Sequence, residues 1–154
     1  MRYAVIMILV FAAPAVAADN MTPFKGVPIV EDVDSFWVEG AHIRLQGVDG
    51  PEVSGRREAA GNAATRYLYE LTRGKELVCA PDGEMTRGRF AATCTLPDGR
   101  DLGDAIVRAG YARDCPFFSG GRYAEAEHEA SAAGRGLWAG SLMPPAPAPY
   151  CRGD

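Results

Sequence analysis

Residues 29–48, with the sequence IVEDVDSFWVEGAHIRLQGV, carry the clearest structural signal in the chain. Phe36-Trp37-Val38 and Ile43-Arg44-Leu45-Gln46 lie on either side of Glu39-Gly40. Aromatic and β-branched runs that flank a glycine turn predict a β-hairpin. Asp49-Gly50-Pro51 follows and is typical of a strand end. We therefore expect an extended segment that is folded back on itself.

The residues after this hairpin alternate between helical and extended patterns. Apolar spacing predicts a helix from a Ser54 cap to about residue 73 and further helices at 102–109 and 122–135. Residues 76–79 and 90–94 have the composition of strands around a polar turn. Short strands with inserted and appended helices predict an α+β domain, most simply a small β-barrel.

The two ends of the chain differ from its middle. Residues 1–18 combine Arg2, an apolar stretch and Ala15-Val16-Ala17, which together predict a cleaved signal peptide. A retained membrane anchor is the alternative, although the apolar stretch is short for one. We expect the folded domain at 19–140 and a Pro/Ala-rich tail at 141–154 that Cys151 pins. The mature protein is then periplasmic or secreted, without stable membrane association, and a monomer.

Composition narrows the classes of partner. The 154 residues carry a formal net charge of −4, and 47% are hydrophobic, so a wholly disordered chain is excluded. Of the sixteen basic residues only Lys25 and Lys75 are lysines. An acidic balance argues against a histone-like coat for long nucleic acid. Single arginines nevertheless suit a small pocket for phosphate or carboxylate oxygens.

Four cysteines, Cys79, Cys94, Cys115 and Cys151, allow three disulfide connectivities in an exported protein. If the strands at 76–79 and 90–94 pair about a centre between residues 86 and 87, position 79 lies opposite position 94. That register favours Cys79–Cys94 and leaves Cys115–Cys151. No CxxC pair is present, so zinc binding has little support.

Acidic and arginine side chains gather at the ends of the predicted hairpin. Asp34 precedes its first strand, Arg44 lies on its second, and Asp49 and Glu52 flank its end. Arg89 comes from the second strand pair. Carboxylates beside arginines can hold a hard cation and a phosphate together.

The ordered set of these motifs resembles the thermonuclease, or staphylococcal-nuclease-like, family. The resemblance rests on the following stretches, which run in order through residues 29–138: Asp32-Val33-Asp34-Ser35, Ile43-Arg44-Leu45-Gln46-Gly47-Val48-Asp49-Gly50-Pro51-Glu52, Gly88-Arg89, Ala105-Ile106-Val107-Arg108-Ala109-Gly110-Tyr111-Ala112 and Gly134-Arg135-Gly136-Leu137-Trp138. It implies a five-stranded oligonucleotide-binding-fold (OB-fold) barrel with about three helices. It also implies calcium-dependent cleavage of DNA and RNA phosphodiesters that leaves a 3′-phosphate and a 5′-hydroxyl.

The same resemblance assigns roles to individual residues. The calcium ligands fall on three of them: Asp34, Asp49 and the backbone carbonyl of Gly50. The catalytic arginine, glutamate and second arginine fall on the following positions: Arg44, Glu52 and Arg89. In such a site the arginines stabilise charge that develops on the phosphate, and the glutamate accepts a proton from the attacking water or orients it.

Some positions depart from the family pattern. Val33 stands where glycine is common, and Gly50 where threonine or alanine is common, which predicts a differently shaped loop and a looser turn. Met85 and Arg87 stand where an acid and a tyrosine are common. The family's paired tyrosines have no clear match, and four nearby aromatic residues are candidates to stack bases instead: Phe117, Phe118, Tyr111 and Tyr123. These departures keep a second hypothesis open, a catalytically inactive OB-fold module that binds nucleic acid, saccharide or a protein partner.

Overall fold

The computed structural model describes residues 21–55, 58–140, 142–143 and 148–153. The expected signal peptide at 1–18 and most of the Pro/Ala-rich run lie outside this described part. The elements, in chain order, are β1 (Phe24–Gly26), β2 (Ile29–Asp32), β3 (Ser35–Val38), β4 (Ala41–Leu45), β5 (Val48–Asp49), α1 (Glu58–Thr72), β6 (Leu77–Thr86), β7 (Arg89–Thr95), α2 (Leu102–Arg108), β8 (Arg113–Asp114), α3 (Pro116–Ser119), α4 (Ala124–Ala132), η2 (Gly136–Trp138) and η3 (Pro149–Cys151).

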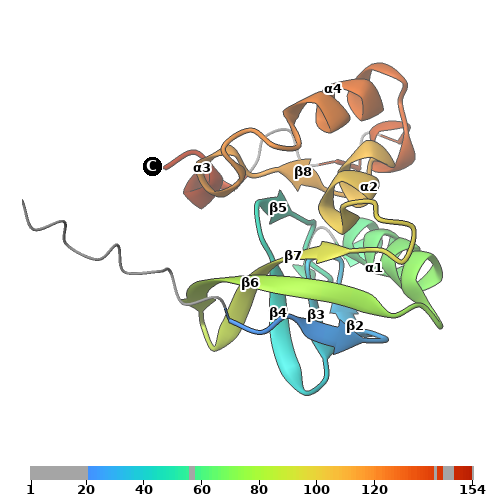
Figure 1. Ribbon diagram of the computed structural model, residues 1–154. Helices are drawn as coiled ribbons and strands as arrows, with labels where there is room; N and C mark the ends of the chain where they lie inside the picture. Colours follow the sequence, from blue (N-terminus) through green and yellow to red (C-terminus); the bar gives the residue numbers. More distant parts are fainter. Residues whose placement is uncertain (1–20, 56–57, 141, 144–147, 154) are drawn as a thin grey trace, which may run out of the picture.

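The strands form a six-stranded sheet in the order β1-β6-β7-β4-β3-β2 and a separate pair, β5-β8. The α+β OB-fold architecture is as expected, with strand segments β1, β5 and β8 in addition to those predicted. The sheet curls and brings β1 near the β3–β4 turn, where the backbone N–H of Lys25 donates to the Glu39 side chain over 2.9 Å. Figure 1 shows β5, β8, α2, α3 and α4 gathered on one side of the molecule, with the curled sheet on the other.

The predicted hairpin is confirmed as β3 and β4, which pair antiparallel with Ser35 opposite Arg44. Its turn, Glu39-Gly40, has positive φ angles of 50° and 79°, as a tight two-residue hairpin requires. The side chains of Phe36 and Ile43 point inward and are fully buried. Alternation along the strands therefore leaves Arg44 on the opposite face from the core.

The second strand pair is longer than predicted, and its register is irregular. Cys79 lies opposite Cys94, as expected, but the register shifts between Pro81 and Met85. This irregularity moves the turn by one residue, because Thr86 pairs with Arg89 and not with Arg87. Arg87 consequently lies in the turn, with a φ of 52°.

Both expected disulfides, Cys79–Cys94 and Cys115–Cys151, are present. The three main helices also lie where the sequence predicts, although α1 begins at Glu58 and not directly after Ser54. The described helices include none with the length and apolar character needed to cross a membrane. The core combines sheet and helix residues that are fully buried, among them Phe36, Ile43, Leu68, Leu77 and Ile106.

Candidate active site

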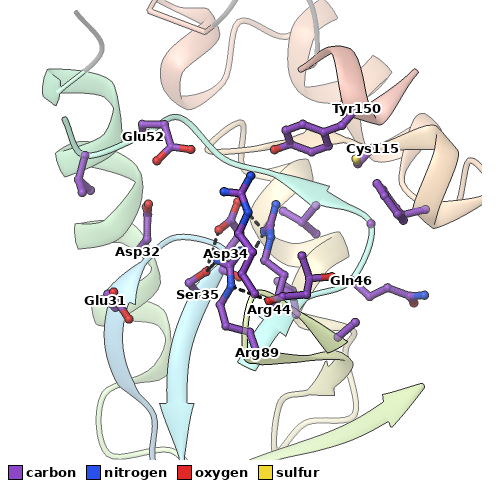
Figure 2. Close-up of a pocket in the computed structure, with 18 residues that line it drawn as sticks. Glu31, Asp32, Asp34, Ser35, Arg44, Gln46, Glu52, Arg89, Cys115 and Tyr150 are labelled. Atoms are coloured by element: carbon purple, nitrogen blue, oxygen red, sulfur yellow. Dashed lines mark hydrogen bonds and ion pairs between the residues drawn. The ribbon is translucent and has the colours of Figure 1, made fainter. Parts of the chain in front are cut away.

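A pocket of about 540 Å³ opens where β3 and β7 begin and β4 ends, beside the loop that follows β5. Three arginines and four acidic side chains contribute to its lining: Arg44, Arg87, Arg89, Glu31, Asp32, Asp34 and Glu52. Figure 2 shows Glu31, Asp32 and Glu52 on the side next to α1, with Asp34, Arg44 and Arg89 near the centre. The structure thus places four of the six predicted site residues around one hollow.

The hairpin register explains the first charged pair. Ser35 lies opposite Arg44 across β3 and β4, so the neighbouring Asp34 comes within reach of the guanidinium group. Arg44 Nη1 lies 2.6 Å from Asp34 Oδ2, and the two side chains are only 16% and 12% exposed. Arg44 Nη1 also donates to the Asp34 carbonyl oxygen over 3.3 Å. The pair holds Arg44 in place while its other N–H groups remain available to a substrate anion.

Ser35 links the second arginine to the same carboxylate. Arg89 Nη1 donates to Ser35 Oγ over 2.7 Å, and Ser35 Oγ donates to Asp34 Oδ1 over 3.3 Å. The hydroxyl can do both because it has one proton and two lone pairs. Sequence reasoning assigned no role to Ser35, although this residue lies within the motif and directly follows a predicted ligand.

Glu52 has a different environment from these paired groups. It lines the pocket, and within the described residues its carboxylate has no hydrogen-bond or ion-pair partner. Its backbone lies against α1 at Gly61, where an added Cβ would overlap the Glu52 carbonyl. Gly61 therefore permits the close approach that brings Glu52 to the pocket.

Asp32 is a pocket residue to which the sequence assigned no role. Burial first, and then the negative charge of Asp34, raise the pKa of Asp32 to about 6. Hydrogen bonds from the Val33 N–H (2.7 Å) and the Thr65 hydroxyl (3.2 Å) to Asp32 Oδ1 oppose this rise in part. The Asp-x-Asp spacing was the signal that this second carboxylate shares the site.

Asp49 and Gly50 adjoin the pocket but, in the described part of the chain, are not among its lining residues. The Gly50 N–H donates to Asp34 Oδ2 over 3.0 Å. Asp49 is 8% exposed and faces the end of the chain. Its Oδ1 accepts a 3.0 Å hydrogen bond from the Tyr150 hydroxyl, and its Oδ2 a 2.9 Å bond from the Ala148 N–H.

The donors expected for calcium are the carboxylates of Asp34 and Asp49 and the carbonyl of Gly50, all of them oxygen atoms. Such a set suits a hard cation, which takes several oxygen ligands. The described residues contain no cluster of three or more histidine, cysteine or acidic side chains arranged to hold a metal by itself. The Asp49 oxygens each keep a lone pair beside the hydrogen bonds described. The donor chemistry of these three residues therefore fits a hard cation such as calcium.

The aromatic residues that are candidates to stack bases differ in their positions relative to the pocket. Phe118 lines the pocket, whereas Tyr123 is fully buried and Tyr111 stacks on Tyr67 with ring centroids 4.3 Å apart. Tyr150 also lines the pocket. It comes from the C-terminal segment, which the sequence pattern predicts to be a tail. Figure 2 shows its ring above the central arginines.

Comparison with known proteins agrees with this arrangement. Residues 42–140 match the family described as staphylococcal nuclease homologue. The chain is 29% identical over 143 residues to the "Succinoglycan biosynthesis protein ExoI" of Rhizobium meliloti, covering 88% of this chain and 73% of that protein.

Two fungal relatives are named "Probable endonuclease LCL3". The protein of Schizophyllum commune is 31% identical over 130 residues, covering 72% of this chain and 44% of its own length. That of Paracoccidioides brasiliensis is 32% identical over 136 residues, covering 77% and 39%. The chain thus spans less than half the length of these fungal proteins. On the family match, which covers residues 42–140 and includes most of the strand that carries Arg44, the chain belongs to the staphylococcal nuclease homologue family.

Proposed function

We propose that this protein is an exported, calcium-dependent nuclease that hydrolyses phosphodiester bonds of DNA, RNA or both. One observation carries the proposal: Arg44 and Arg89, joined through Asp34 and Ser35, face the same pocket as the carboxylate of Glu52, which has no partner among the described residues. An anion binds between the two fixed guanidinium groups, and the Glu52 carboxylate beside them can accept a proton from water. Asp34 and Asp49 would hold calcium, and the ion would supply positive charge that stabilises the reacting phosphate.

The arginines act on the charge of the reacting phosphate. As water attacks, negative charge grows on the equatorial oxygens, and donors already held in place stabilise it without reorganising. Arg44 is held by Asp34 and Arg89 by Ser35, so each guanidinium is oriented before substrate binds. The remaining N–H groups of both arginines can then donate charge-assisted hydrogen bonds to the phosphate oxygens.

Glu52 accepts a proton from the attacking water as the new P–O bond forms. The P–O bond to the 5′-oxygen then breaks, and that oxygen takes a proton from solvent to leave as a hydroxyl. The phosphate stays on the 3′-oxygen. Because Glu52 has no hydrogen-bond partner among the described residues, its carboxylate oxygens can accept a hydrogen bond from that water.

Export is the second part of the proposal. The signal-like sequence at 1–18 motivates it. The two disulfides support it, because such bonds persist mainly in oxidising compartments.

The test is hydrolysis of single-stranded DNA by the mature protein with calcium, without it, and in the Glu52→Gln variant. We expect the substitution to lower the rate by about 10² to 10³. Glu125→Gln, at an exposed position on α4, is the matched control and should retain wild-type activity. Activity that ignores both calcium and Glu52→Gln would refute the mechanism. Saturable nucleic-acid binding without hydrolysis would favour the inactive binding module.

A further inference from the structure

The C-terminal segment 148–151 contacts one of the predicted site residues, Asp49. Asp49 accepts hydrogen bonds on both carboxylate oxygens from this segment, at 3.0 Å from the Tyr150 hydroxyl and 2.9 Å from the Ala148 N–H. Rotation of the carboxylate would break both bonds. Donors about 100 positions away in sequence therefore set the orientation of an acid beside the pocket.

The Cys115–Cys151 disulfide brings these donors to Asp49. Cys115 follows β8, the strand that pairs with β5 and places Arg113 opposite Asp49. Cys115 also donates its N–H to the Gly47 carbonyl over 2.9 Å, which fixes it beside the start of β5. Cys151 is fully buried, and Tyr150 precedes it in the same turn of η3.

Two hydrogen bonds are a weak restraint without the covalent link. Ordering a chain segment costs conformational entropy at every residue, and the net contribution of a hydrogen bond is smaller than that cost for several residues. The Cys115–Cys151 disulfide limits how far the segment 148–151 can move away from Asp49. It is therefore the element that makes the contacts with Asp49 persistent.

Tyr150 is placed to act as a positioning donor. Its hydroxyl donates to Asp49 Oδ1 over 3.0 Å, and Tyr150 also lines the pocket. Hydrogen bonds from a second layer of residues commonly orient the carboxylates that bind metal ions. Each Asp49 oxygen retains a lone pair for a cation beside the bond it accepts here.

We propose that Tyr150 and the Ala148 N–H are positioning groups for Asp49, so that calcium binding depends on the oxidised Cys115–Cys151 disulfide. The inference rests on the proposed calcium-dependent function and adds a means of regulation to it. A dithiol breaks the S–S bond by supplying two electrons and two protons, which yields two cysteine thiols while the dithiol closes to its own disulfide. The reduced protein then has a free C-terminal segment and a less ordered Asp49.

The second disulfide provides an internal control. Cys79 and Cys94 lie opposite each other on neighbouring strands, β6 and β7, and do not line the pocket. Cys79→Ala/Cys94→Ala therefore removes a buried disulfide without touching Asp49. Tyr69→Phe, at an exposed position on α1, is the control for loss of a tyrosine hydroxyl.

The experiment measures calcium affinity by titration calorimetry on the full mature protein, together with its melting temperature. We expect Tyr150→Phe to weaken calcium binding about 10-fold and Cys115→Ala/Cys151→Ala about 10- to 100-fold, the range typical for loss of groups that orient metal ligands. Tyr69→Phe and Cys79→Ala/Cys94→Ala should keep wild-type affinity. Reduction of the wild type should reproduce the Cys115→Ala/Cys151→Ala value. Tyr150→Phe keeps both disulfides, so it tests the proposal even if a cysteine variant fails to fold.

Three results with the variants would overturn the inference. Tighter calcium binding in Tyr150→Phe would mean that the segment covers Asp49 and competes with the cation. Unchanged binding would mean that the contact only fastens the chain end, and equal losses in the two cysteine pairs would indicate general destabilisation. If the wild type binds calcium with the expected pattern but cleaves no nucleic acid, the proposed function fails and the inference stands. If it cleaves nucleic acid without binding calcium, nuclease activity stands, and both the calcium requirement and this inference fall.

Discussion

Val33 Cγ1 fills the space that a Cβ at position 50 would need. Val33 is fully buried, and its φ is not among the positive angles of the described non-glycine residues. The family pattern commonly has glycine at the first of these positions and threonine or alanine at the second. Val33 therefore occupies the space in which a larger residue at position 50 would place its side chain, so Gly50 lies tightly against its neighbour.

Gly50→Ala should lower the free energy of unfolding by about 1–3 kcal/mol, because the new methyl group overlaps Val33 in a packed site. Adding Val33→Ala should recover part of this loss, with a coupling energy of about 0.5–3 kcal/mol. Urea unfolding of both single variants and the double variant measures the coupling. Gly26→Ala is the control, since a Cβ there meets its nearest atom at 3.5 Å, an ordinary contact. Additive effects would contradict the shared-volume interpretation.

Ser35→Ala should lower kcat for nucleic-acid hydrolysis about tenfold, equivalent to about 1.4 kcal/mol of barrier. The substitution removes the hydroxyl that accepts from Arg89 and donates to Asp34, so the guanidinium group loses its orientation. Ser131→Ala removes an exposed hydroxyl on α4 and should have no effect. Wild-type kcat in Ser35→Ala would show that Arg89 needs no such support.

Gly61→Ala should impair hydrolysis although residue 61 lies on α1 and not in the pocket. An alanine Cβ would overlap the Glu52 carbonyl, so the Glu52 backbone must move away from the helix. A misplacement of about 1 Å at a catalytic group can cost up to about 10²-fold in rate. Steady-state kinetics of Gly61→Ala and of Asn62→Ala, at the neighbouring exposed position, measure the effect. Equal activity in the two variants would contradict it.

Asp32 should make the protein less stable as pH rises from about 4 to about 6. Its folded-state pKa, about 6, lies above its ordinary value of 3.8, so the folded state holds the proton more tightly than the unfolded state. The contribution is therefore present at low pH and lost as pH rises through the folded-state pKa. Asp32→Asn should flatten this dependence in urea unfolding without calcium, whereas Glu125→Gln should retain the wild-type slope. A slope that Asp32→Asn leaves unchanged would contradict the raised pKa.

Features of the hairpin and of the cysteine register could be predicted because they depend on neighbours in sequence or across one turn. The Glu39-Gly40 turn places Arg44 within a few residue pairs of Asp34, and the Cys79–Cys94 pairing follows from counting back from a turn. The irregularity between residues 81 and 85 was not predicted, because no alternation rule marks where a strand inserts extra residues. It leaves the cysteines paired but moves the turn.

Local patterning was sufficient for the hairpin, the three main helices and the order of the charged motifs, since periodicity and turn chemistry act over a few residues. Three other features could be seen only in the folded chain. They are the contact of Tyr150 with Asp49, the close packing of Val33 against Gly50, and the contact of α1 with the Glu52 backbone. Each joins side chains or backbone whose meeting depends on how separate elements pack, and packing is set by the shape and volume of the whole core. Tyr150 belongs to a segment whose composition is typical of a solvated tail. It nevertheless lines the pocket, next to the disulfide that joins Cys151 to Cys115.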